Sequence, residues 1–448
     1  MHGRILQAVS VTMVGQILSQ AIRLGGNLIM TRLLVPEMFG LMSIVFMVQF
    51  TLSLLSDIGL RAAVIQNRRG DEAQLLNTVW TIQVLRGVGL SVLCLLIAFG
   101  LFIAGRAGVF QAGTALGDPQ LPFLLAVASL SLLISGFLSS NHMTAGRNLA
   151  LRRIVLIELA SQIVSLIVMV AVAYLTRSVW SIVISGIVAS AVTVALSHTI
   201  LPGIRNHFLL NREIIGEIYK FGLAILVSSI TFVLATNMDR ALLGALVSAA
   251  TLGVYAIAQN LCAAAEGLIS RLFESVVLPA LSEASRTSEA RLREQFKRLR
   301  LPFDLWYLGA SGMLFALAPS IVSFLYDERY HDAGTMLQIL SLTLIFSRFG
   351  VFSMAYVAVG KPEYMAITHI VRLVAIAVSL PLLFHAYGIY GAIYAVALHH
   401  AALVPIYYVF NRRLGLNDLR YECRVLSAWP AGYVLGLALI GIGRFVFG

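Results

Sequence analysis

Charged residues are scarce in this sequence. Asp, Glu, Lys and Arg make up 12% of its 448 residues, whereas 59% are hydrophobic. Soluble domains carry roughly 25% charged residues. A chain of this composition cannot bury its apolar side chains in one aqueous core, which argues against a soluble globular protein. The composition predicts an all-α protein that crosses a membrane many times.

Cysteine is rare as well, and Cys94, Cys262 and Cys423 are far apart in the sequence. Because their spacing fits neither a disulfide framework nor a metal site, we interpret them as apolar packing residues and expect no bound metal. Long polar loops that could fold into a separate soluble domain are also lacking. The net charge of +11 is spread among hydrophobic segments, so we expect no nucleic-acid partner.

The hydrophobic residues gather in segments long enough to cross a bilayer, which takes about 20 apolar residues per helix. The predicted spans are 9–30, 39–60, 76–104, 121–140, 154–175, 179–200, 219–238, 251–272, 303–325, 334–357, 364–384, 388–410 and 426–447. The first run shows no small-residue cleavage site, so we expect a retained helix and not a signal peptide.

Basic residues in the connecting loops predict the orientation. If the N-terminus is cytoplasmic, most Arg and Lys residues fall in inside loops, and the outside loops carry few. Those few are Arg32, Arg106, Arg177, Arg240 and Arg329. This asymmetry follows the positive-inside rule up to the twelfth span, and a thirteenth span would place the C-terminus outside.

The spans divide into two halves. TRLLVPEMFGLMSI (31–44) and DRALLGALVSAATLGVYAI (239–257) form a weak internal repeat, which predicts two six-helix lobes related by a pseudo-twofold axis along the membrane normal. The predicted domains are an N-lobe with its linker (1–216), a C-lobe (217–413), and a linker with an additional helix (414–448). We interpret the basic stretch 282–300 as a surface helix on the anionic cytoplasmic leaflet.

Arginine is present where the membrane makes it unfavourable. Arg23, Arg86 and Arg348 lie deep within predicted spans, and Arg372 lies nearer the cytoplasmic end of its span. A charge at the bilayer centre costs about 2.5–3.5 kcal/mol on insertion scales, so each needs a reason. Polar residues accompany three of them at helical spacing: Gln16, Gln20 and Asn27 around Arg23, Gln83 before Arg86, and Gln338 before Arg348.

Deep carboxylates that could neutralise these arginines are few. Glu266 is the clear candidate. The other acidic residues near these spans lie toward cytoplasmic helix ends, and they are Asp57, Glu158, Glu274 and Asp304. The excess of positive charge favours an anionic cargo such as a diphosphate, whose oxygens match the planar donors of arginine. The structural alternative, in which each arginine joins helices through a carboxylate or a carbonyl, stays open.

Two residues are candidates for ion coupling. Glu266 and His399 lie within predicted spans and could carry a cation or a proton, although a membrane histidine is more often an interhelical hydrogen-bonding group. We expect no cofactor, with transport driven by an H⁺ or Na⁺ gradient or by the membrane potential.

Several short motifs occur in order along nearly the whole chain: TRLLVPEMFGLMSIV, SDIGLRAAVIQ, TNMDRALLG, LGVYAIA, VLPALSEASR and VGKPEYMA. Together they resemble the polysaccharide-repeat flippases of the multidrug/oligosaccharidyl-lipid/polysaccharide exporter superfamily, which includes lipid II flippases. The resemblance implies a V-shaped pair of six-helix lobes in the bacterial inner membrane. It also implies an undecaprenyl-diphosphate-linked oligosaccharide as cargo. Arg23 matches, by position, an essential first-helix arginine of lipid II flippases.

The predicted function is therefore transport of lipid-linked oligosaccharide repeat units by alternating access, with no enzymatic activity. Polysaccharide polymerase and chain-length proteins are possible partners. The alternatives are a lipid II flippase and a cation-coupled multidrug antiporter, which needs deep acidic residues. A membrane-bound polymerase or ligase is disfavoured, because such enzymes present large periplasmic loops, and the outside loops here are short.

Overall fold

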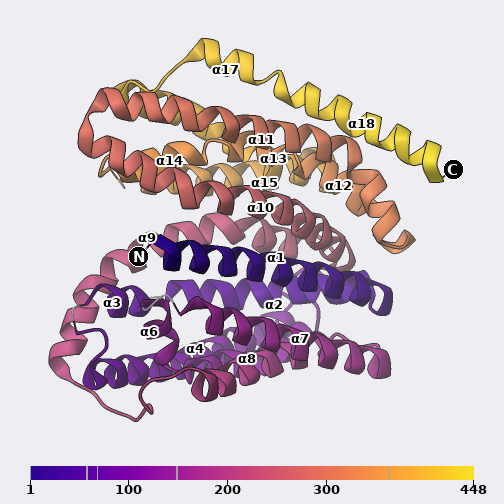
Figure 1. The fold of residues 1–448 in the computed structure, drawn as a ribbon. Helices are drawn as coiled ribbons and strands as arrows, with labels where there is room; N and C mark the ends of the chain where they lie inside the picture. Colours follow the sequence, from indigo (N-terminus) through magenta and orange to yellow (C-terminus); the bar gives the residue numbers. More distant parts are fainter. Residues whose placement is uncertain (1, 57–58, 68, 148–149, 362, 448) are drawn as a thin grey trace. The chain divides into compact units, whose positions relative to one another are not determined.

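The computed structural model describes residues 2–56, 59–67, 69–147, 150–361 and 363–447. The side chains of 2–10, 62–63, 66, 218–231, 268–269, 271–276 and 443–447 are outside the description, as are Asp57 and the Glu274 side chain. Within the described part, all regular structure is helical (Figure 1). The predicted all-α membrane fold is confirmed.

Two compact units divide the chain. Unit 1 contains Met1–Val233 and Gly244–Leu252, and unit 2 contains Leu234–Leu243 and Gly253–Gly448. The chain passes between them within α9 (Arg212–Leu246) and near the start of α10 (Ala249–Thr287). The C-terminal segment 414–448 thus belongs to unit 2, and the lobe boundaries given above stay predictions.

Unit 1 is built from paired helices. They are α1 (His2–Leu33), α2 (Pro36–Leu55), α3 (Leu60–Gln66), α4 (Ala73–Arg106), α5 (Leu121–Gly136), α6 (Asn141–Arg147), α7 (Leu151–Thr176) and α8 (Trp180–Ile200). Helix α4 packs on α5, and α7 packs on both α1 and α8. Glycines allow the first of these contacts, because a Cβ on Gly87 would lie 2.7 Å from the Cα of Gly136.

An extended segment, 201–211, leaves α8 and is held along unit 1 by side chains. Asn141 receives a hydrogen bond from the Ile204 amide (3.2 Å) and donates one to the Ile204 carbonyl (3.0 Å). The Leu209 amide donates to the Thr81 hydroxyl at 2.9 Å. These side chains satisfy backbone groups that the segment, which has no secondary structure, leaves open.

Unit 2 contains part of α9, most of α10, the long helix α11 and everything after it. Its helices from α11 onward are α11 (Glu289–Leu325), η1 (Glu328–Tyr330), α12 (Asp332–Leu340), α13 (Thr343–Ser347), α14 (Gly350–Ala358), α15 (Glu363–Leu398), η2 (His399–Leu403), α16 (Val404–Leu414), α17 (Leu419–Val425) and α18 (Ala428–Phe447). Helix α18 lies along α11 (Figure 1). An aromatic core that includes Phe303, Phe352 and Tyr407 joins α11, α14 and α16.

Most of each predicted span coincides with a helix, and several differ in detail. The helix of the fourth span ends at Gly136, and the twelfth span begins within α15 and is interrupted by η2. The second span ends at Leu55, before Gly59, whose φ of 65° is left-handed and does not continue a helix. The tenth span is interrupted, since α12, α13 and α14 replace one helix. Among the described residues, eight helices are long and apolar enough to cross a membrane, or nine if the bent pair α5–α6 forms one span.

The prediction of a surface helix over 282–300 is wrong. The stretch contains the end of α10 and the start of α11, separated at Ser288, whose hydroxyl caps α11 by accepting a hydrogen bond from the Arg291 amide. Leu292 and Phe296 are buried in the core of unit 2, so the apolar face of this stretch packs against protein.

Candidate functional site

The polar residues predicted on the first span lie on α1. Arg23 is exposed, and its Nη2 donates to Gln20 Oε1 at 2.7 Å, one turn earlier. Gln16, Gln20 and Asn27 are half-buried. The structure therefore brings Arg23 and Gln20 together.

Gln83 and Arg86 both lie on α4 and contact helix ends. Gln83 is buried and donates to the carbonyls of Gly136 (3.1 Å) and Leu138 (2.9 Å), where α5 ends. Arg86 donates to the Ser56 hydroxyl at 2.9 Å and to the Ser53 carbonyl at 2.6 Å, where α2 ends. A cation at a helix C-terminus is stabilised by the helix dipole and by the free carbonyls there.

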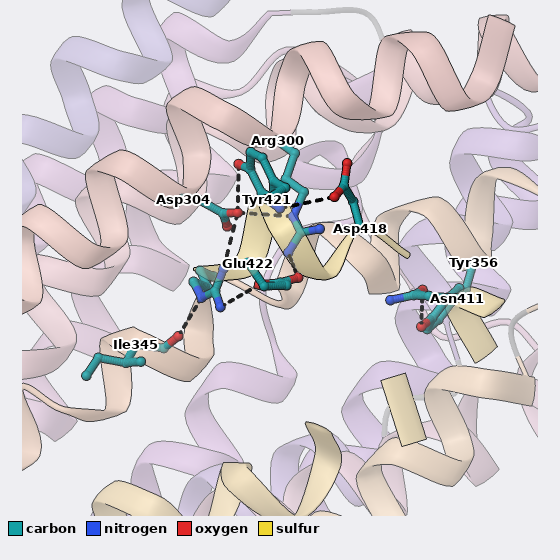
Figure 2. Close-up of polar contacts among 9 residues, drawn as sticks. Arg300, Asp304, Ile345, Tyr356, Asn411, Asp418, Tyr421 and Glu422 are labelled. Atoms are coloured by element: carbon teal, nitrogen blue, oxygen red, sulfur yellow. Dashed lines mark hydrogen bonds and ion pairs between the residues drawn. The ribbon is translucent and has the colours of Figure 1, made fainter. Parts of the chain in front are cut away.

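Unit 2 contains a buried network of four charged side chains, which Figure 2 shows. Asp304 of α11 is fully buried, and Arg300 and Arg348 are each 3% exposed. Arg300 Nε lies 3.0 Å from Asp304 Oδ2, and Arg348 Nη1 lies 3.2 Å from the same oxygen. Glu422 of α17 completes the network, with one carboxylate oxygen on each arginine and a distance of 2.8 Å to Arg348 Nη2.

Neutral groups hold the same network. The Tyr421 hydroxyl donates to Asp304 Oδ2 at 3.0 Å, and Arg348 Nε donates to the Ile345 carbonyl at 3.1 Å. Aromatic rings cover the guanidinium groups. The ring centroid of Phe352 lies 4.7 Å from Arg300 Cζ, and the ring centroid of Phe349 lies 4.4 Å from Arg348 Cζ. With two positive and two negative charges in mutual contact, the network is electrically balanced.

This balance changes the interpretation of Arg348. Its predicted role in binding an anionic cargo rested on a shortage of buried carboxylates, and around Arg348 that premise is wrong, because Asp304 and Glu422 both pair with it. Gln338 is half-buried on α12, and within the described part of the chain no contact joins its side chain to Arg348. We therefore assign Arg348 to the scaffold of unit 2.

Arg372 of α15 has different surroundings. Its Nε donates to His399 Nε2 at 3.1 Å, and His399 Nδ1 lies 2.6 Å from the Val396 carbonyl. This arrangement requires neutral His399 with its proton on Nδ1, because Nε2 must accept. No described carboxylate forms an ion pair with Arg372. Among the described residues, Arg372 thus has a neutral imidazole and no carboxylate in direct contact.

Acidic and tyrosyl groups surround this pair at longer range. The carboxylates of Asp239 (α9) and Glu266 (α10) act on Arg372 electrostatically. The Tyr255 hydroxyl donates to Asp239 Oδ2, whereas Oδ1 is buried and has no hydrogen-bond partner among the described residues. The His400 ring stacks 4.1 Å from His399. The structure therefore brings the predicted residues Arg372 and His399 into contact, whereas Glu266 acts on Arg372 only at longer range.

Several members of these clusters do not stand out in the sequence. Arg300, Tyr421 and Glu422 belong to no predicted site, and Asp239 falls only within the internal repeat. One signal was available: Arg300 and Asp304 stand four apart at the start of a span, a spacing that brings side chains together on a helix. Their pairing with Arg348 and Glu422 joins residues 44 and 122 positions apart, which no local pattern reveals.

Comparisons with known proteins agree with this architecture. A family model described as "Polysaccharide biosynthesis protein" matches residues 29–333. Lipopolysaccharide biosynthesis protein WzxC of Escherichia coli (strain K12) is 21% identical over 317 residues, which cover 70% of this chain and 61% of that protein. The chain thus matches less than two thirds of its curated relative's length.

Solved structures show the same fold. A lipid II flippase MurJ in an inward closed conformation superposes with a TM-score of 0.68 at 12% identity, covering 97% of this chain and 99% of that chain. An inward-facing multidrug resistance MATE transporter of the MOP superfamily gives a TM-score of 0.64 at 14% identity, covering 98% and 100%. The chain is a multi-pass membrane protein with the fold of MOP-superfamily transporters, and it belongs to the polysaccharide biosynthesis protein family.

Proposed function

We propose that this protein is a flippase that moves undecaprenyl-diphosphate-linked oligosaccharide repeat units from the cytoplasmic to the periplasmic leaflet of a bacterial inner membrane. Its N-terminus lies in the cytoplasm, and it works by alternating access without enzymatic chemistry. Membership of a polysaccharide biosynthesis family and a fold similar to a lipid II flippase support this proposal.

The observation that carries the proposal is the state of Arg372. Its guanidinium lies in an apolar helix and is bound by neutral His399, with no ion pair among the described residues. A permanent charge in such a place is unfavourable. Asp239 and Glu266 act on it only at longer range, so an anion that contacts the guanidinium would stabilise it further. A diphosphate is well suited, since its oxygens accept the paired hydrogen bonds that a guanidinium donates. Arg23 and Arg86, both in unit 1, are proposed cargo-binding residues as well.

Ion coupling involves the same cluster. We propose Glu266 and His399 as the coupling residues, driven by H⁺, Na⁺ or the membrane potential. The geometry makes the role of His399 specific. Its Nε2 accepts from Arg372, so a second proton there would displace the guanidinium by direct repulsion. Protonation of His399 would therefore release Arg372. Polysaccharide polymerase and chain-length proteins are the proposed partners.

A cation-coupled drug antiporter is the second candidate, because Asp239 supplies a further membrane carboxylate beyond Glu266. A lipid II flippase is the third, since its cargo carries the same diphosphate. All three can be compared in proteoliposomes that contain the purified protein and one cargo: a fluorescent undecaprenyl-diphosphate oligosaccharide, lipid II, or a cationic dye.

Substitutions connect the outcome to the residues. We expect flipping of the oligosaccharide lipid by the wild-type protein, and loss of that activity in Arg23→Ala and Arg372→Ala with unchanged yield and folding. Uptake of the cationic dye without lipid flipping would replace the proposal with the antiporter. Normal polysaccharide export in cells that carry only the Arg23→Ala protein would remove Arg23 from the site.

A further inference from the structure

The tenth span changes from α-helical to tighter turns at two points. Between α12 and α13, the Leu344 amide donates to the Ser341 carbonyl at 3.1 Å, three residues back. Between α13 and α14, the Phe349 amide donates to the Phe346 carbonyl at 3.0 Å, again three residues back. Turns of this 3₁₀ type in the middle of a helix often mark a hinge. We call Ser341–Leu342 the first junction and Arg348–Phe349 the second junction.

Side chains bind the carbonyls beside both junctions, from α10 and α11 at the first and from the span itself at the second. At the first junction, the Ser311 hydroxyl of α11 donates to the Ser341 carbonyl at 2.8 Å. Beside it, Cys262 Sγ of α10 lies 3.4 Å from the Leu340 carbonyl. At the second junction, Arg348 Nε donates to the Ile345 carbonyl at 3.1 Å. Non-helical backbone at membrane depth is tolerated where protein groups satisfy it in this way.

The C-terminal segment α17–α18 reaches the first junction through Ser311 and the second junction directly. Trp429 Nε1 of α18 donates to the Ser311 hydroxyl at 3.1 Å, and that hydroxyl in turn donates to the Ser341 carbonyl. Glu422 of α17 accepts from Arg348 Nη2 at 2.8 Å, and Arg348 Nε in turn donates to the Ile345 carbonyl. Two separate hydrogen-bond chains thus connect one segment to the two ends of α13.

Close packing of α18 on α11 holds the two hydrogen-bond chains in place. A Cβ on Gly312 would lie 2.1 Å from the Trp429 carbonyl, and a Cβ on Gly432 would lie 2.3 Å from the Gly309 carbonyl. The absence of side chains at these glycines lets α18 sit directly against α11. Any movement of α17–α18 on α11 must therefore change the contacts at both junctions.

We propose that α17–α18 sets the conformation of the interrupted span α12–α14, with Glu422 and Trp429 as positioning residues for its movement. The inference rests on the proposed function only in linking that movement to transport. A 3₁₀ stretch in the middle of a helix often marks a functional hinge. The additional C-terminal helix is thus a control element: its two hydrogen-bond chains favour one conformation of α13, and their loss shifts the population toward others.

Hydrogen–deuterium exchange of the full-length protein in nanodiscs tests the hinge without any cargo. Glu422→Gln weakens the chain to the second junction, and Trp429→Phe removes the donor to Ser311 while keeping an aromatic ring against Phe315 and Tyr433. We expect amides 341–349 to exchange about tenfold faster in each variant. The matched control is Glu289→Gln, which removes an exposed ion pair with Arg293 on the same helix α11.

The alternatives give different patterns. Exchange at 341–349 that equals the wild-type rate in both variants would overturn the inference. So would faster exchange spread evenly over all of unit 2, because that pattern indicates general destabilisation. If Trp429→Phe does not fold, Ser311→Ala interrupts the same chain with a smaller change and is judged by the same criterion.

Transport measurements separate this inference from the proposed function. In proteoliposomes we expect Glu422→Gln and Trp429→Phe to lower the maximal flipping rate while the affinity for the oligosaccharide lipid stays unchanged, since neither residue contacts cargo in this scheme. Faster exchange at 341–349 in a protein that flips no lipid would support the hinge and reject the flippase. An unchanged flipping rate with altered exchange would show that the hinge does not serve transport.

Discussion

Arg348 and Arg372 lie in the same unit and in similarly apolar spans, yet their partners differ. Arg348 contacts two carboxylates and a carbonyl, and it is almost fully buried. Arg372 contacts a neutral imidazole. The comparison teaches that an arginine in a membrane helix is not in itself a sign of cargo binding. Its charge becomes available only where the fold leaves it without an anionic partner.

The difference has an energetic consequence. Breaking a buried ion pair leaves an uncompensated charge in a medium that solvates it poorly, so substitutions around Arg348 should act on stability. Removal of Arg372 takes away a charge with no contacting carboxylate, so it should act on transport and spare the fold. The following predictions test that contrast, beginning with the largest effect.

Asp304→Ala should destabilise the protein most. Asp304 contacts both buried arginines and Tyr421, so its loss leaves Arg300 and Arg348 with Glu422 alone. Breaking a buried pair costs about 3–5 kcal/mol. We expect a marked fall in the yield of monodisperse protein and in its thermal midpoint in detergent. A yield and a thermal midpoint equal to those of the wild type would show that the network contributes little to the stability of the fold.

Arg372→Ala should reduce lipid flipping about 100-fold, a loss of about 2.7 kcal/mol, with a small change in the thermal midpoint. Arg372→Lys should recover part of the rate, because it keeps the charge and loses the planar donor set. The measurement is the initial flipping rate in proteoliposomes beside the thermal midpoint. If stability falls as far as in Asp304→Ala, the contrast between the two arginines does not hold.

Tyr421→Phe removes one hydroxyl and no charge. The hydroxyl donates to Asp304 Oδ2, which still accepts from both arginines in the variant. A hydrogen bond to a charged group contributes about 1.5–3 kcal/mol, and we expect the lower end because two donors remain. The thermal midpoint should fall modestly while flipping at permissive temperature stays normal. A flipping defect in the folded variant would implicate the network directly in transport.

Glu289→Gln should have the smallest effect. The Arg293–Glu289 pair is a helical pair in which the glutamate side chain is 87% exposed. Exposed pairs contribute about 0.2–1 kcal/mol and weaken as salt rises. We expect a thermal midpoint indistinguishable from wild type. A clear fall in the thermal midpoint would mean that exposed ion pairs of unit 2 also stabilise the fold, which would weaken the distinction between buried and exposed pairs.

Local pattern predicted the helices well and their irregularities poorly. Long apolar runs specify a membrane helix, because every backbone group must be satisfied within the segment. The interruption of the tenth span was not visible, because its carbonyls at Leu340, Ser341 and Ile345 are satisfied by side chains from α10, α11 and the span itself. In the stretch 282–300, the sequence shows a basic face, but it does not show the aromatic core that covers the other face.

The candidate site shows the same limit. The helical spacing predicts Gln20 and Arg23 on one face of a helix, and in the structure they form a hydrogen bond, since residues three apart on a helix are neighbours. The count of deep carboxylates failed, because Asp304 and Glu422 lie at helix ends by sequence yet reach Arg348 in the fold. When the depth of a residue in the membrane is estimated from span boundaries, the length of its side chain and the packing of helices that follow later in the chain are ignored.

The sequence by itself determined that this chain is a bundle of membrane helices with arginines inside it, because hydropathy and helical period are local properties. Only the tertiary structure decided which arginine has its charge matched. Ion pairs form between side chains brought together by packing, and the partners of Arg348 and Arg372 come from helices far along the chain. Charge balance in a membrane protein is therefore a property of the fold and not of the span.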